Sequence, residues 1–187
     1  MIKPRPSVAA AASVALAALA CVTLHASLIV PTDLPTLVRE AQTIVLGRVT
    51  DVRGVIRPGT RRVDSYVAFA VDDAIKGRAA RTILFKTLGG VSGRYRTIVH
   101  GSPVFERGDE AVLFLGRGAT PYPIGLTHGV FRVRSDRASG ERRILPPPML
   151  IDPKATMTIR RGDGTRVPIP VGSFTAMLRD LAARRQP

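Results

Sequence analysis

Cysteine is nearly absent from this chain, since Cys21 is the only one among its 187 residues. Exported domains often depend on disulfides, and a chain with one thiol cannot form an internal disulfide. The fold must therefore be stabilised by its hydrophobic core. A domain of about 150 residues buries roughly 68 to 70 % of its unfolded surface, so a single domain of this length can supply that core.

Catalytic motifs are missing as well. After residue 26 the histidines are His100 and His128, and neither lies in the H-E-x-x-H spacing of a zinc site. Ser102 follows His100 closely but has no G-x-S-x-G elbow around it. The glycine-rich segment 89–93 lacks the Lys-Ser/Thr pair of a phosphate-binding loop. We therefore expect no enzyme activity, no catalytic residue, no cofactor and no metal site.

The first 26 residues have the pattern of an export signal. Lys3 and Arg5 form a basic start, Val8 to Leu24 is uncharged and apolar, and Ala26 offers a small residue at a cleavage point. We expect a signal peptide over 1–26, a mature protein that is secreted or periplasmic, and no stable membrane span after cleavage. Two alternatives stay open. One is an uncleaved anchor, although its apolar stretch is shorter than the roughly 20 residues that a bilayer requires, and the other is a lipoprotein acylated at the single cysteine.

Acidic residues are few, and positive charge dominates. The chain carries 28 Lys and Arg against 14 Asp and Glu, a formal net charge of +14. Such a charge attracts polyanions such as nucleic acid, lipopolysaccharide phosphates or acidic polysaccharides, and the attraction weakens with salt. A compositional origin is the alternative, because arginine, alanine and glycine all have GC-rich codons.

Alternation of apolar and polar residues with period two dominates the middle of the chain. Val63 to Ile75 predicts a half-buried antiparallel strand, with Val63, Val67, Phe69, Val71 and Ile75 on one face. The segment 44–52 is rich in β-branched residues and predicts a more fully buried strand. Further strands are expected at 82–88, 95–100, 111–116 and 130–134.

Turn sequences separate these strands, with glycine at 57–60, 88–90, 106–109 and 138–140. Short strands at this spacing favour an all-β barrel or sandwich. We expect a mainly β fold whose domain over 27–144 is a small OB-like antiparallel β-barrel, with Phe105 filling its interior. The glycines at 89–90 are expected to let the backbone bend sharply or approach other backbone closely.

Two helices are expected beside the strands. A short N-terminal helix over 34–41 has Thr32 or Asp33 as its N-cap and tolerates Pro35 in its first turn. A C-terminal amphipathic helix has Ser173 as its N-cap. Its apolar residues at helical spacing, which predict core packing, are Phe174, Met177, Leu178 and Leu181.

The segment 145–187 is expected to pack on the barrel as a strap, a hairpin and this C-terminal helix. Prolines at 146–148 and 153 enforce extended backbone, as in a strap. Two short strands at 157–161 and 165–169 flank a Gly-Asp-Gly turn, which predicts the C-terminal hairpin.

Several blocks of the sequence resemble an uncharacterised family of exported bacterial β-rich proteins. They are LPTL at 34–37 leading into IVLGRV at 44–49, IKG at 75–77, GSPVFERGDEAVLFL at 101–115 and HGVF at 128–131. This resemblance covers about 34–134 and implies export and the β-rich architecture, but no activity. A more distant similarity is to the OB-like barrel of netrin-type modules, including tissue inhibitors of metalloproteinases. Those inhibitors bind the target's metal through an N-terminal Cys, which this chain lacks after Ala26.

Two basic loops form the candidate binding site. Segments 53–62 and 89–96 are expected to surround one mouth of the barrel, where OB-like folds place ligand loops. Arginine pairs with phosphate or carboxylate, and tyrosine can stack. The predicted ligand-binding residues are Arg57, Arg61, Arg62, Arg94, Tyr95 and Arg96.

Carboxylates are densest at Glu106, Asp109 and Glu110. We expect them to pair with Arg94, Arg96 or Arg107. A calcium ion is the less favoured alternative, because three side chains supply too few oxygen ligands.

These features together predict a monomeric, non-catalytic binding module whose basic loops hold an envelope polyanion. The alternative is a protein-interaction or inhibitor-like module that acts on an exported protein partner such as a protease. One contiguous arginine surface favours the first, and scattered arginines beside an exposed apolar patch favour the second.

Overall fold

The computed structural model describes residues 33–136, 139–147 and 167–184. The chain divides between residues 30 and 31 into two units, and all the described residues belong to the second unit. Of the predicted hairpin, the strand at 157–161 and the turn lie outside the described residues, as does part of the proline strap, 148–153, whereas Ile169 is described and pairs with Ile144. Within them no helix is long and apolar enough to cross a membrane.

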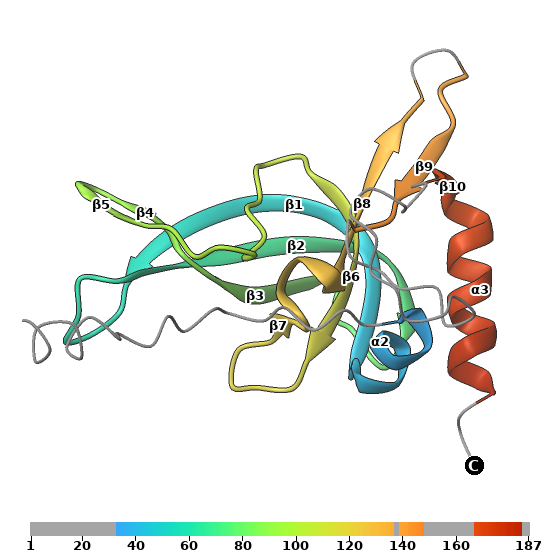
Figure 1. Ribbon diagram of the computed structural model, residues 1–187, viewed down its shortest axis with the longest axis horizontal. Helices are drawn as coiled ribbons and strands as arrows, with labels where there is room; N and C mark the ends of the chain where they lie inside the picture. Colours follow the sequence, from blue (N-terminus) through green and yellow to red (C-terminus); the bar gives the residue numbers. More distant parts are fainter. Residues whose placement is uncertain (1–32, 137–138, 148–166, 185–187) are drawn as a thin grey trace, which may run out of the picture. The chain divides into compact units, whose positions relative to one another are not determined.

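An antiparallel sheet of eight strands makes up most of the described chain (Figure 1). Its strand order is β10-β9-β8-β6-β1-β2-β3, with β7 paired to β6. The strands are β1 (Thr43–Ile56), β2 (Val63–Lys76), β3 (Thr82–Leu88), β6 (Glu110–Gly116), β7 (Tyr122–Pro123), β8 (Val130–Ser135), β9 (Arg142–Leu145) and β10 (Ile169–Pro170). A separate hairpin joins β4 (Gly90–Ser92) to β5 (Tyr95–Thr97). The predicted mainly β, antiparallel class is confirmed, although the strand expected over 95–100 ends at Thr97.

The predicted closed barrel is wrong, because the ladder of the described strands ends at β3 on one side and at β10 on the other. β3 approaches the β6–β7 connection, where the Lys86 N–H donates to the Pro121 carbonyl at 2.9 Å. Proline has no N–H, and both Pro121 and Pro123 lie in this short segment. The segment therefore cannot extend a regular ladder to β3, and a seam remains between β3 and β6–β7.

The sheet has a hydrophobic core on each face. Successive residues of a strand point to opposite faces, and every residue of β6 from Ala111 to Gly116 is buried. Val112 and Phe114 join the core that also contains both helices, whereas Leu113 and Leu115 join the opposite core. In the opposite core Phe105 packs edge-on against Phe85, with ring centroids 5.2 Å apart. Phe105 is thus buried as expected, but in the core on one face of an open sheet and not in the interior of a closed barrel.

β2 departs from the predicted single apolar face. Val67 and Phe69 lie in the core opposite the helices, but Ile75 lies in the helix-side core. The β1–β2 register shifts between Leu46 and Gly47 and again between Ile44 and Val45. At the first shift Asp72 has no partner in the β1–β2 register, and this extra residue moves the side chains that follow it in β2 to the other face.

The short helix α2 (Leu34–Glu40) is observed where it was predicted. The Thr36 N–H donates to the Asp33 carboxylate at 2.6 Å, so Asp33 is the N-cap. At the other end, Lys76 Nζ donates to the carbonyls of Val38 and Ala41, each at 2.6 Å. Lys76 thereby joins the end of α2 to the end of β2, and its burial lowers its pKa.

The C-terminal helix α3 (Val171–Ala183) begins before the predicted N-cap Ser173. Pro170 stands at the N-cap with a φ of −53°, and among the described residues no side chain caps the first turn. Phe174 and Leu178 are buried as expected, and Phe174 packs on Phe131 of the sheet with ring centroids 5.0 Å apart. The apolar spacing thus predicts the helix and most of its packed face, but Met177 is exposed and Leu181 is only partly buried. The fixed φ of proline places the first turn earlier than predicted.

Candidate functional site

The β4–β5 hairpin brings the two predicted basic loops to the same end of the β1–β2 ribbon. Gly54 of β1 lies directly against β4, since a Cβ at Gly54 would be 1.9 Å from the Val91 carbonyl oxygen. The Val63 N–H donates to Thr97 Oγ1 at 2.8 Å, and Ser65 Oγ donates to the Gly89 carbonyl at 2.8 Å. Figure 1 shows this hairpin at the end of the ribbon away from α2 and α3.

We call this end the basic tip. It comprises Arg53, Arg57, Arg61, Arg62, Arg94, Tyr95 and Arg96. The predicted placement around the mouth of a closed barrel is corrected with the barrel itself. The tip instead lies where the β1–β2 turn and the β4–β5 hairpin extend beyond the larger sheet.

The glycines at 89–90 fulfil their predicted role. Gly89 has a φ of +85° and is buried, and a Cβ there would be 2.9 Å from the Thr97 carbonyl oxygen. Gly90 has a φ of +151°, and a Cβ there would be 2.3 Å from Ser65 Oγ. Both positions require glycine, because backbone and side-chain atoms fill the space that a Cβ needs.

Arg57 is held in a salt bridge and does not present a free charge. Its guanidinium donates to both carboxylate oxygens of Asp64, with Nη2 at 3.1 and 2.9 Å and Nε at 3.3 Å. Asp64 is buried, and Lys86 Nζ approaches the same carboxylate at 3.9 Å. Arg57 therefore compensates a buried negative charge at the start of β2, which is a structural role.

Arg53 is also paired. Its Nε donates to Asp51 at 2.7 Å, and this hydrogen bond holds the pKa of the Asp51 carboxyl below its usual value. Both groups are largely exposed, so the pair contributes little to stability.

Arg94 and Tyr95 interact with each other. The Arg94 guanidinium carbon lies 5.2 Å from the centroid of the Tyr95 ring, and its Nη2 donates to the Tyr95 hydroxyl at 3.1 Å. A cation–π contact orients the guanidinium over one ring face. The predicted pair is thus brought together, with one face of Tyr95 covered by its neighbour.

Arg61, Arg62 and Arg96 are exposed, and none forms a salt bridge within the described part of the chain. The β1–β2 turn that carries the first two is fixed by the Arg57 N–H donating to the Arg62 carbonyl at 2.8 Å. Arg96 lies opposite Val91 in the β4–β5 ladder. These three side chains, together with Arg94, carry the positive charges of the basic tip that no carboxylate of the described residues compensates, and only Arg94 is engaged with a neighbouring ring.

Two of the three predicted carboxylates, Asp109 and Glu110, pair with arginines, but not with the predicted ones, and Glu106 forms no salt bridge within the described residues. Glu110 pairs with Arg48 and with Arg142, whose Nε lies 3.1 Å from it. Asp109 accepts a hydrogen bond from Arg132 at 2.7 Å. These partners come from β1 and β8, which flank β6 in the sheet, and from β9, which pairs with β8, so strand pairing rather than sequence proximity selects them. Within the described residues no three ligating side chains form a metal-binding group.

The remaining polar residues considered from the sequence are Ser102, His100 and His128. Ser102 Oγ donates to the Leu88 carbonyl at 2.6 Å, so its hydroxyl proton is engaged with backbone. His100 is exposed, and the described residues contain no hydrogen bond between it and Ser102. His128 is buried in the 3₁₀ turn η1 (Leu126–Gly129), and desolvation lowers its pKa.

The closeness of the two loops was predicted from the sequence, whereas their internal pairing was not. The period-two pattern over 63–75 gives no sign that Asp64 is buried and forms a salt bridge with Arg57. Comparison with known proteins finds no family model, no curated protein and no solved structure that matches the chain, so both resemblances suggested by the sequence stay predictions.

Proposed function

We propose that this protein is a non-catalytic binding module that holds a polyanion at the basic tip, and that it acts outside the cytoplasm as its N-terminal sequence predicts. The observation that carries the proposal is the group of three exposed guanidiniums, Arg61, Arg62 and Arg96, which form no salt bridge within the described residues. Each can donate a pair of hydrogen bonds to a phosphate, sulfate or carboxylate.

The backbone of the tip supports this function. The turn after β1 is closed by the Arg57 N–H donating to the Arg62 carbonyl and by Thr60 Oγ1 donating to the Arg57 carbonyl at 3.0 Å. The hairpin is fixed to β2 by the Thr97 and Ser65 hydrogen bonds. Arginines on an ordered backbone lose less entropy when they bind than arginines on a flexible tail.

A protein partner is the second candidate, and the exposed apolar side chains of the same end favour it. Val55, Ile56 and Val91 have relative exposures of 45 %, 39 % and 58 %. A surface that mixes arginine with aliphatic side chains also suits a protein interface, in which arginine is enriched and the buried centre is apolar. The two candidate functions predict different effects on polyanion binding when the arginine charges of the basic tip are removed.

The test is binding of duplex DNA, heparin and lipopolysaccharide to the purified protein near physiological salt. The tip variant replaces Arg61, Arg62 and Arg96 with Gln. The control variant, which loses the same charge, replaces Arg78, Arg81 and Arg134 with Gln, since these are also exposed and form no salt bridge within the described chain.

We expect the tip variant to bind more than about tenfold more weakly, since it removes three surface ion pairs of up to about 1 kcal/mol each. The control variant should change affinity by less than about threefold. Equal weakening in both variants would show that net charge alone attracts the polyanion, and it would refute the tip as a site. Absence of binding to all three probes would favour the protein-partner candidate.

A further inference from the structure

A pocket lies at the seam between β3 and the β6–β7 connection, away from the basic tip. Its volume is about 340 Å³. We call it the seam pocket and use six of its lining residues, Gln42, Thr43, Ile83, Leu115, Arg117 and Pro121. It exists because β7 does not form a ladder with β3, so the same prolines that keep the sheet open also leave this opening.

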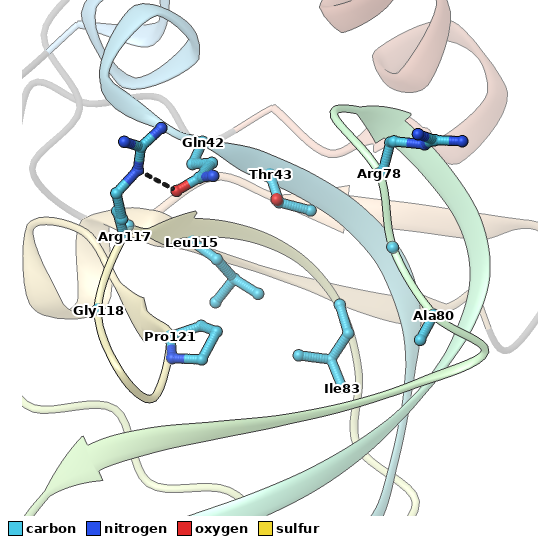
Figure 2. Close-up of a pocket in the computed structure, with 11 residues that line it drawn as sticks. Gln42, Thr43, Arg78, Ala80, Ile83, Leu115, Arg117, Gly118 and Pro121 are labelled. Carbon is cyan, nitrogen blue, oxygen red and sulfur yellow. Dashed lines mark hydrogen bonds between the residues drawn. The ribbon is translucent and has the colours of Figure 1, made fainter.

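The interior of the pocket is apolar. Leu115 belongs to the core opposite the helices and is 2 % exposed, and Ile83 packs against that core. Figure 2 shows Leu115, Ile83 and Pro121 around the centre of the pocket. An aliphatic group that enters here would continue the existing hydrophobic core and lose its contact with water.

One margin of the pocket carries hydrogen-bond donors. Arg117 Nε donates to Gln42 Oε1 at 2.9 Å, as the dashed line in Figure 2 marks. This bond uses the amide oxygen of Gln42, so its NH₂ group and the two terminal nitrogens of Arg117 remain as donors. Thr43 adds a hydroxyl, and Arg78 stands at the opposite margin with its guanidinium directed outward.

The charge of the lining has one sign. Arg78 and Arg117 line the pocket, and no Asp or Glu of the described ranges does. A cationic ligand would meet two guanidiniums with no carboxylate, and a neutral one would leave the guanidinium of Arg117 without a counter-charge. An anion with an apolar tail satisfies both the donors and the interior.

We propose that the seam pocket binds an amphipathic monoanion, an aliphatic carboxylate whose head group meets Arg117 and Gln42 and whose tail covers Leu115 and Ile83. At about 30 Å³ for each water-sized group, the pocket holds roughly ten non-hydrogen atoms, which corresponds to a chain of about eight carbons. This site is independent of the basic tip, because it shares no residue with it.

The experiment is titration of the purified protein with octanoate, followed by amide chemical shifts. Acetate, 1-octanol and octylammonium are the comparison ligands. We expect saturable shifts at Thr43, Gly116 and Gly118 with octanoate, binding at least about tenfold weaker with acetate or octanol, and no binding with octylammonium. The variant Arg117→Gln should weaken octanoate binding about tenfold, and Arg117→Lys should weaken it less.

Two controls separate this proposal from the polyanion site. The tip variant should keep its octanoate affinity, and Arg117→Gln should keep its heparin affinity. Equal affinity for octanoate and 1-octanol would overturn the anionic head group, and non-saturable shifts would overturn the site. Loss of octanoate binding in the tip variant would also contradict it, whether or not heparin binds.

Discussion

Substitution of Gly54 with alanine tests how β4 is placed on β1. A Cβ at this position would lie 1.9 Å from the Val91 carbonyl oxygen and 2.6 Å from its carbonyl carbon. Both are backbone atoms, and Cβ contacts under 3.0 Å essentially do not occur, so β4 must move by about 1 Å or more. The hydrogen bonds that the β4–β5 hairpin makes with Val63 and Ser65 would then lengthen or break.

The expected loss of stability follows from this close packing. Overpacking costs about 1 to 3 kcal/mol, and partial loss of the two anchoring hydrogen bonds, which contribute about 1 kcal/mol each when intact, adds about 1 kcal/mol. We therefore expect Gly54→Ala to lower the free energy of unfolding by about 2 to 4 kcal/mol. With a urea m-value of about 2 kcal/mol/M, the denaturation midpoint falls by about 1 to 2 M. Heparin affinity should fall about fivefold, because displacement of Arg96 removes one charged interaction.

Gly172→Ala is the matched control. Gly172 lies in α3 with nothing within 4 Å of an added Cβ, so alanine there should be neutral or stabilise the protein by up to about 1 kcal/mol. A Gly54→Ala variant with the wild-type urea midpoint and the wild-type heparin affinity would refute the close approach of β4 to β1.

Three further predictions concern single polar groups. Asp64→Asn removes the charge that holds Arg57, so urea denaturation should show a loss of about 1 to 3 kcal/mol, while heparin titration should show unchanged or tighter binding. Weaker heparin binding with intact stability would contradict this. Lys76→Met leaves the final carbonyls of α2 without their donor and should cost about 1 to 3 kcal/mol in the same assay, with Lys86→Met, at a half-buried lysine, as its comparison. Burial lowers the pKa of His128, so the unfolded chain binds a proton more readily than the folded chain below about pH 6.5. The free energy of unfolding should therefore fall between about pH 7.5 and pH 5.5, and it should fall less in His128→Gln; an identical fall in both proteins would rule out this cause.

The sequence predicts the positions of strands more reliably than it predicts whether the sheet closes into a barrel. Period-two alternation places a strand over 63–75, and β2 spans Val63–Lys76. Closure depends instead on the prolines at 121 and 123 and on the distance between β3 and β7, which alternation does not encode. Of the β4–β5 hairpin only the second strand was expected, as the start of 95–100, because β4 has three residues and lies in the glycine-rich segment that was interpreted as a loop.

The candidate site is predictable in outline and not in detail. Two arginine-rich loops flanking neighbouring strands were expected to meet, and close packing at Gly54, Thr97 and Ser65 brings them to one end of the β1–β2 ribbon. Which arginines keep an uncompensated charge depends on how side chains pair in the folded protein, and the sequence does not show that pairing. The seam pocket was also missed, because Gln42 and Arg117 are far apart in sequence and meet only through the pairing of β1 with β6.

The salt dependence of DNA binding tests the central proposal most directly. For a duplex oligonucleotide titrated between about 50 and about 200 mM salt, the slope of log K against log salt falls by about 0.9 for each phosphate that the protein no longer neutralises. We predict that the tip variant reduces the slope by about 2 to 3 relative to wild type, while the variant at Arg78, Arg81 and Arg134 leaves it nearly unchanged. Equal slopes for the two variants, whether both are reduced or both match wild type, would contradict a polyanion site at the basic tip.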